Sequence, residues 1–141
     1  MDESILQVAT HEGDGYAPVI DFESWRVALL NTADQYREEN LTYMERHDQT
    51  DEVFVLLKGT CVLVIGDGGD DLGEITAHLM ERGVFYNVRE AAWHTCALSD
   101  GTSVLIVENR DTGRHNSTYI DLSDDQKKHI VRTVKKARAG A

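Results

Sequence analysis

Several features are rare or absent in the sequence, and each absence excludes a class of protein. It has one proline, Pro18, and two cysteines, Cys61 and Cys96, which form neither a C-x-x-C pair nor a disulfide framework. No apolar run approaches the ~20 residues that a membrane-spanning helix needs. The first residues, M-D-E-S-I-L-Q, lack the basic region and apolar core of a secretory signal. We therefore expect reduced thiols, a cytoplasmic location and no membrane association.

Positive charge is also scarce. The chain has 14 Lys and Arg against 25 Asp and Glu, a net charge of −11, which predicts no binding to nucleic acid across a broad surface. From Ser123 onward there are six Lys or Arg and two Asp, so this tail carries +4 and the rest of the chain −15. We interpret the basic tail as a solvated helix face.

Short apolar runs at regular spacing fill most of the chain. With 141 residues, 41% of them hydrophobic, the chain suits a single domain spanning 1–141. Residues 1–20 form a loose lead-in with room for one short edge strand, and 31–40 form a loop. Alternation and polar turns predict strands over 25–30, 41–47, 52–58, 60–65, 74–80, 84–88, 93–98, 103–109 and 118–122. This spacing is typical of an antiparallel sandwich or barrel.

A helix is expected at the end of the chain, over about 124–138. Ser123 is a good N-cap, and Asp124 and Asp125 fall in the first turn. Ile130 and Val134 belong to a narrow apolar stripe. The helix should pack either on the wall of the β domain or on a neighbouring subunit.

Four side chains could carry chemistry. Glu45 and His47 are two apart on one strand and point to the same face, and a hairpin across 48–51 brings Glu52 close to His47. His94 lies on a later strand and shares a face with Cys96. Histidine and carboxylate groups inside an apolar barrel are costly to bury unless they pair or bind a metal.

The stretches around these residues resemble the paired motifs of the cupin family. The first motif, G-x5-H-x-H-x3or4-E-x6-G, is matched by His47, Glu52 and Gly59. The second, G-x5-P-x-G-x2-H-x3-N, is matched by Gly83 and His94. The resemblance covers roughly residues 40–108, about half of the chain.

The chain departs from these motifs at several positions. Glu45 stands where the first histidine is usual, and residue 39 is Glu where a glycine precedes it. Arg89 replaces the proline of the second motif, and Ala91 replaces its glycine. These departures leave the role of Glu45 open.

The resemblance implies an all-β fold, a single antiparallel jelly-roll β-barrel with its core at about 25–122, followed by the C-terminal α-helix. It also implies a homodimer and a small-molecule site inside the barrel. In metal-binding members the matching residues hold a divalent metal. Carried over, the ligands are His47, Glu52 and His94, with Glu45 as fourth ligand or general base. Such a set favours Fe(II), Mn(II), Ni(II) or Zn(II).

Two other functions fit the same residues. One is a metal-free isomerase or epimerase acting on a sugar or sugar nucleotide, with His47 as base and Tyr86 near the pocket. The other is a non-catalytic module that binds a small ligand. The fold alone does not decide among the three.

Several other residues are interpreted as structural. Tyr86 and Trp93 are expected in the core or at the rim, and Cys96 as a buried inert thiol rather than a soft ligand. Arg46 and Arg89 are expected as exposed charges, although either could meet an anionic substrate at the barrel mouth. The remaining histidines are expected at the surface: His11, His78, His115 and His129.

Overall fold

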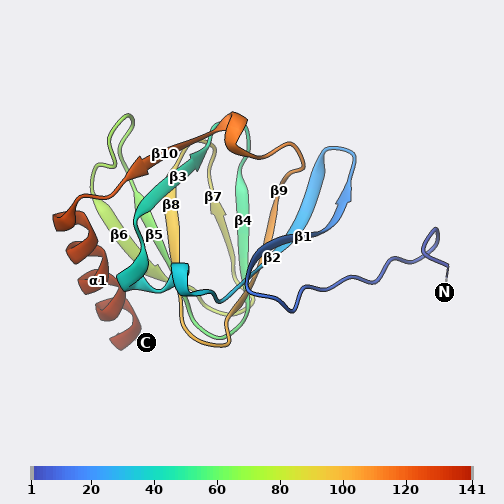
Figure 1. Cartoon of the computed structure of the whole chain (residues 1–141), viewed down its shortest axis with the longest axis horizontal. Coiled ribbons are helices and arrows are strands. Elements are labelled where there is room, and N and C mark those ends of the chain that lie inside the picture. The colour runs from blue at the N-terminus through green and yellow to red at the C-terminus, as the bar shows by residue number, and fades with distance from the viewer. Residues whose placement is uncertain (1, 141) are drawn as a thin grey trace.

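The computed structural model describes residues 2–140 and contains ten strands, three short 3-10 turns and one α-helix (Figure 1). The strands are β1 (Gly15–Phe22), β2 (Trp25–Asn31), β3 (Tyr43–His47), β4 (Glu52–Lys58), β5 (Cys61–Gly66), β6 (Ile75–Leu79), β7 (Phe85–Val88), β8 (Trp93–Leu98), β9 (Ser103–Asn109) and β10 (Ser117–Asp121). The 3-10 turns are η1 (Asp34–Tyr36), η2 (Glu38–Asn40) and η3 (Arg114–Asn116), and the helix is α1 (Asp124–Ala139).

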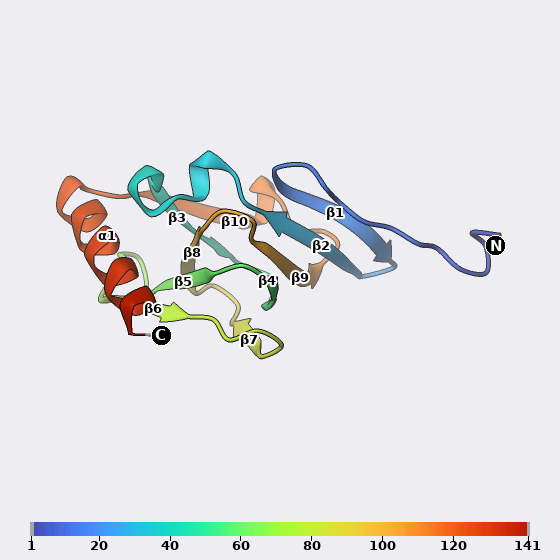
Figure 2. The same cartoon turned by 90° about the horizontal axis from the view of Figure 1, so that it is seen from below.

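The strands form two five-stranded antiparallel sheets. The first has the order β1-β2-β9-β4-β7 and the second the order β10-β3-β8-β5-β6. Neighbours in each sheet are mostly distant in sequence, as in a jelly roll. Figure 2 shows α1 at one end of the molecule and the N-terminal segment leaving at the other. The expected all-β jelly-roll fold with a C-terminal helix is confirmed.

One core cluster fills the space between the sheets. Alternation places Phe54 and Leu56 of β4 and Ile106 of β9 against residues of the second sheet such as Leu63 and Leu98. All five are almost fully buried. Because Glu52 and Glu108 are in phase with these residues, their carboxylates also face the interior of the jelly roll.

A second core cluster lies on the other side of the second sheet, beneath α1. Ile130 and Val134 of the helix pack with residues that include Met44 and Trp93. Ser123 caps the helix by accepting a hydrogen bond from the Gln126 backbone N–H. The helix therefore packs on its own chain, the first of the two arrangements left open above.

The sheet begins earlier than the expected core at residue 25. The lead-in contains an eight-residue strand, β1, which pairs along its length with β2 and is the outer strand of the first sheet. Pro18 and a register shift between Pro18 and Ile20 interrupt its pattern, which hides the strand in the sequence. No helix within residues 2–140 is long and apolar enough to cross a membrane.

Candidate functional site

A cavity of about 280 Å³ lies between the two sheets. All four of the side chains expected to carry chemistry line it: Glu45, His47, Glu52 and His94. The rest of the lining is largely aromatic and polar, and includes Tyr16, Arg26, Tyr36, Tyr43, Glu108, Ser117 and Tyr119. The jelly roll thus gathers residues from β1 to β10 around one site.

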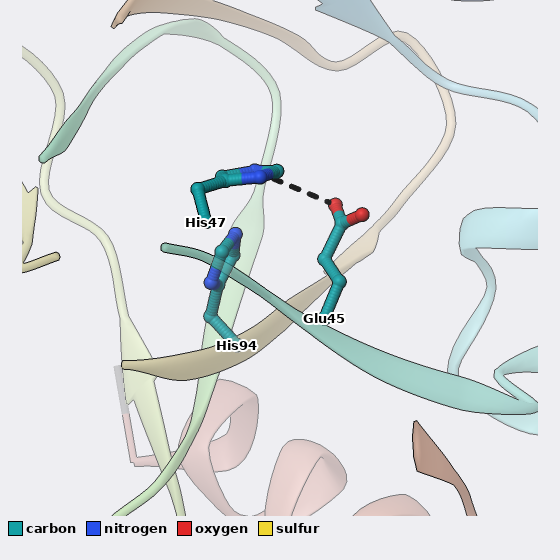
Figure 3. A group of neighbouring side chains, drawn as sticks. All are labelled: Glu45, His47 and His94. Carbon is teal, nitrogen blue, oxygen red and sulfur yellow. Dashed lines mark ion pairs between the residues drawn. The ribbon is translucent and has the colours of Figure 1, made fainter. Parts of the chain in front are cut away.

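The pairing of β3 with β8 brings the two motif stretches together. Glu45 lies directly opposite His94 in the register of these strands. His47 is two residues further along β3 on the same face, and its ring centroid lies 5.2 Å from that of His94. Figure 3 shows Glu45, His47 and His94 converging on one point.

Glu52 lies between the two imidazoles. Its Oε2 is 3.0 Å from His47 Nε2 and its Oε1 is 3.2 Å from His94 Nε2. Glu45 is further away, with its Oε1 4.0 Å from His47 Nε2. Glu52 and His94 are buried, whereas the Glu45 carboxylate is partly open to the cavity.

The contact made by Nδ1, on the side away from the cavity, fixes the ring orientation of each histidine. His94 Nδ1 lies 3.0 Å from the Ala92 carbonyl oxygen, and a carbonyl only accepts, so Nδ1 carries the proton. His94 Nε2 is buried and, despite its distance to Glu52, has no partner in hydrogen-bond geometry. His47 Nδ1 lies 2.8 Å from Ser117 Oγ. Both imidazoles therefore present Nε2 to the cavity.

The turn before β8 ties the second motif to the first. The Ala91 N–H donates a 2.8 Å hydrogen bond to the His47 carbonyl oxygen. Ala91 has φ 61°, a left-handed conformation that favours glycine, which is the usual residue at this position of the motif. The turn thus keeps its shape with alanine in place of glycine, at some backbone strain.

Charges are strongly coupled in the site. Burial alone would raise the pKa of Glu52, but the two neighbouring imidazoles hold it far below its usual value. Burial lowers the pKa of His94, yet the Glu52 carboxylate outweighs this effect and raises it to about 9. The pKa of His47 is raised for the same reason. Without a metal, the Glu52 carboxylate is therefore held as an anion beside two imidazoles whose pKa values it raises.

Two further carboxylates show the opposite behaviour. Burial raises the pKa of Glu45, and the nearby imidazoles offset only part of that effect. Burial and the Glu52 carboxylate raise the pKa of Glu108 to about 7, against the opposing effect of Tyr16 and Arg26. Glu45 and Glu108 thus hold a proton more readily than an exposed glutamate does.

A cluster around Glu108 lies outside the sequence motifs. Glu108 Oε1 accepts hydrogen bonds from the Tyr16 hydroxyl at 2.5 Å and from Arg26 Nη2 at 3.0 Å. Arg26 also donates hydrogen bonds to the backbone carbonyls of Arg110 and Thr112, so this guanidinium is held in place on several sides. The available signal was phase, since Glu108 lies two and four residues from Ile106 and Val104 in S-V-L-I-V-E-N and so shares their face.

Several secondary expectations met different outcomes. Tyr86 packs against the core between the sheets, as expected, and does not line this cavity, where the metal-free alternative placed it. Its hydroxyl accepts from the Glu81 N–H. Trp93 is core under α1, as expected. Arg46 stacks on the Trp93 ring, 4.7 Å from its centroid, and the exposed Arg89 pairs with Asp51. Neither arginine lines the cavity.

The cysteines and the other histidines lie outside the candidate ligand sets. The Cys61 thiol and burial raise the pKa of Cys96 well above its usual value, so Cys96 remains a protonated thiol at the cavity wall. His78 and His115 are exposed, as expected, whereas His11 and His129 are half-buried. His129 Nε2 lies 3.0 Å from the Ile75 carbonyl and so links α1 to β6.

The donor atoms are spaced closely enough to hold an ion. Two groups have ligand atoms within 4.8 Å of one another: Glu45, His47 and His94, and then His47, Glu52 and Glu108. Two ligands about 2.1 Å from one ion at right angles are about 3.0 Å apart, close to the spacing of Glu52 from each imidazole. The orphaned Nε2 of His94 points into this space. The residues therefore fit a metal.

Comparison with known proteins identifies the fold only. No protein-family model matches the chain, and no curated protein sequence matches it. A cupin-2 domain protein from Shewanella frigidimarina superposes with a TM-score of 0.52 at 16% identity, covering 70% of this chain and 85% of that one. A cupin 2 domain-containing protein from Halorhodospira halophila gives 0.51 at 12%, covering 88% and 80%.

A third solved structure is an enzyme. The Streptomyces protein Pac13, described as a nucleoside dehydratase, superposes with a TM-score of 0.56 at 8% identity, covering 83% of this chain and 88% of that one. These likenesses confirm the cupin fold that the sequence motifs indicate. Identities this low say nothing of the substrate or reaction.

Proposed function

We propose that this cupin-fold protein binds one divalent transition metal in the cavity and acts there on a small polar molecule. His47, Glu52 and His94 are the proposed ligands, and Glu45 is the fourth ligand or the general base. The observation that carries this proposal is His94 Nε2, which is buried, lacks a hydrogen bond and faces the other donors. A hydrogen bond from Nδ1 to a backbone carbonyl is the usual way that proteins orient a metal-binding histidine.

A metal bound here would polarise an oxygen of the ligand and stabilise negative charge on it. The chain's own residues do the remaining work. Ser117 and Ala92 orient the two imidazoles. Glu45 is the most open of the acidic groups near the imidazoles, and its raised pKa suits the exchange of a proton with a molecule in the cavity. Two imidazoles and two carboxylates favour Fe(II), Mn(II), Ni(II) or Zn(II).

The test is the metal content of the purified chain. Protein prepared without added metal should contain close to one transition-metal ion per chain by elemental analysis. His47→Ala and His94→Ala should lose at least about tenfold in metal affinity, because each removes a ligand. The control is His78→Ala, which removes an exposed histidine far from the ligand set in sequence and should keep the metal. Full metal retention in His94→Ala would overturn the ligand assignment.

A metal-free acid–base enzyme is the second candidate. The observation in its favour is the complete ion pair between His47 and Glu52 at 3.0 Å, which needs no ion to stabilise it. The substrate class would be a sugar, a sugar nucleotide or a nucleoside, the last suggested by the fold likeness to Pac13, solved with uridine. A chain that gains no thermal stability from any divalent ion, but binds uridine or a sugar nucleotide by calorimetry, would support this candidate.

The third candidate, a non-catalytic ligand-binding module, shares the same cavity. It would be supported by a small molecule that binds to the chain with constant affinity and is not converted to a product. We also keep the cytoplasmic location and the homodimer as proposals. The free, buried thiols of Cys61 and Cys96 are compatible with a reducing compartment.

A further inference from the structure

Two carboxylates lie side by side on the inner face of the first sheet. The register of β4 with β9 places Phe54 opposite Ile106. Two residues further along each strand, on the same face, are Glu52 and Glu108. Each glutamate is only 5% exposed. Like charges directly opposite each other destabilise a sheet, and burial adds to the cost because little water is present to screen them. A cation that contacts both carboxylates would stabilise the pair.

Arg26 and Tyr16 hold one oxygen of Glu108 and leave the other free. Arg26 lies opposite Glu108 on β2, which flanks β9 on the side away from β4. Its Nε and Nη2 atoms and the Tyr16 hydroxyl all donate to Oε1. In the described part of the chain no donor reaches Oε2, and Glu108 lines the cavity. Carboxylates that bind metals are commonly held by such hydrogen bonds.

Glu108 is close enough to His47 and Glu52 to bind the same ion. The ligand atoms of these three residues all lie within 4.8 Å of one another. Beside them is the buried Nε2 of His94, which lacks a hydrogen bond and lies 3.2 Å from Glu52 Oε1. Because two carboxylates together neutralise the charge of a divalent ion, a metal at this point would remove the repulsion between Glu52 and Glu108.

Glu45 is the competing donor, and it fits the role less well. With His47 and His94 it forms the other group of closely spaced ligand atoms. Its side chain is 32% exposed, however, against 2% for Glu108. Among the described residues its carboxylate has one charged neighbour within 4.0 Å, His47, and that distance is too long for a hydrogen bond. Glu45 is therefore open to the cavity, whereas Glu108 is buried and fixed.

We infer that Glu108 is the fourth protein ligand of the metal and that Glu45 does not bind the ion. The other three ligands remain His47, Glu52 and His94, so the set comes from β3, β4, β8 and β9 and includes both sheets. Glu45 is then free to exchange a proton with a molecule in the cavity. The inference rests on the metal site of the proposed function and settles the role of Glu45, which the motif leaves open.

Glu108→Gln tests this assignment with little change of shape. The amide oxygen can still accept the hydrogen bonds of Arg26 and Tyr16, which turns the amide NH2 toward the other ligands. An amide NH2 only donates and cannot bind a metal. The affinity for Zn(II), measured by competition with a chromogenic chelator, should therefore fall at least about tenfold. Glu45→Gln is the matched control, the same substitution at the competing donor, and should bind Zn(II) as tightly as the wild type.

The visible absorption of bound Co(II) distinguishes the loss of a ligand from a general weakening of the fold. Its bands should change in Glu108→Gln, because the coordination of the ion changes, and should match the wild type in Glu45→Gln. Far-UV circular dichroism verifies that each variant is folded.

Two results overturn the inference. One is wild-type Zn(II) affinity in folded Glu108→Gln, and the other is a loss in Glu45→Gln as large as that in Glu108→Gln. If Glu108→Gln does not fold, Tyr16→Phe replaces it, since it removes one hydrogen bond to Glu108 and should weaken Zn(II) binding about tenfold. Wild-type affinity there has the same meaning. A wild type that binds neither Zn(II) nor Co(II) overturns the metal site itself, which is a separate outcome.

Discussion

His94 is the residue on which the two motif stretches depend. Its ring is 3% exposed, its Nδ1 proton is fixed on the Ala92 carbonyl, and its Nε2 faces Glu52 without a proper hydrogen bond. In the neutral ring this nitrogen is an acceptor that faces a carboxylate, and a buried polar atom left without a partner destabilises a protein by about 1–3 kcal/mol. This arrangement therefore leaves His94 Nε2 available to bind a ligand in the cavity.

The pH dependence of the metal-free protein follows from the same residue. The folded pKa of His94 is about 9 against an ordinary value of 6.5. The proton is bound more tightly in the folded chain, so stability on the order of 3 kcal/mol is present below pH 6.5 and is lost as pH rises toward 9. Glu108 acts with the same sign, since its folded pKa of about 7 lies above its ordinary 4.5.

Urea unfolding in the presence of a chelator should therefore show stability that falls between pH 6 and pH 9. In His94→Gln, which cannot titrate in this range, the part of the fall above pH 7 should be much smaller. His115→Gln is the control, because His115 is exposed and should leave the profile unchanged. Identical profiles for wild type and His94→Gln would contradict the assigned charge on His94.

Motif spacing identifies only some of the residues that line the cavity. Glu45, His47, Glu52 and His94 could be found because each falls in or beside a recognisable motif. Glu108 could have been found only by phase, and Tyr16 and Arg26 only from the pairing of β1 with β2 and of β2 with β9. Such neighbours depend on tertiary contacts across up to 92 residues of sequence.

Among the elements, the turn between β4 and β5 tolerates little change. Gly59 has φ 79°, and a Cβ built there would overlap the side chain and backbone of Thr102. Thr102 in turn accepts a hydrogen bond from the Thr60 N–H, so it has little freedom to move. Gly59→Ala should lower the free energy of unfolding by about 2–4 kcal/mol, from backbone strain plus the steric clash.

Gly83 provides the matched comparison. It has nearly the same backbone angle, φ 81°, but nothing lies within 4 Å of a Cβ built on it. Gly83→Ala should therefore lower the free energy of unfolding by only about 1 kcal/mol, from the backbone alone. Equal losses for the two variants in urea unfolding would show that the contact with Thr102 is unimportant.

Elements with strong local signals were predicted well. The helix expected over 124–138 is observed at Asp124–Ala139. Its start is marked by a capping box between Ser123 and Gln126, a signal that depends only on neighbouring residues. The strand expected over 52–58 is β4. β1 was underestimated because its pattern is interrupted, and it is held largely by its partner β2.

In the molecule as a whole, the second sheet separates two cores. The core between the sheets supports the cavity, and the core beneath α1 lies on the opposite side. Ile130→Ala removes a fully buried side chain from the second core and should lower the free energy of unfolding by about 2–5 kcal/mol. Metal affinity should remain within about twofold, since distant sites act independently.

Lys128→Ala is the control for that variant, because it changes an exposed position on the same helix. Calorimetric titration with a divalent metal and urea unfolding, performed on the same preparations, give the two quantities. A tenfold loss of metal affinity in folded Ile130→Ala would show that the two cores are coupled through the sheet.

The amino-acid sequence by itself determined the fold class, the terminal helix and the identity of four chemically capable side chains, because alternation, caps and motif spacing are local properties of the chain. Only the tertiary structure decided what surrounds them. Strands far apart in sequence had to pair before Glu52 could lie between two imidazoles and before Glu108 could join them.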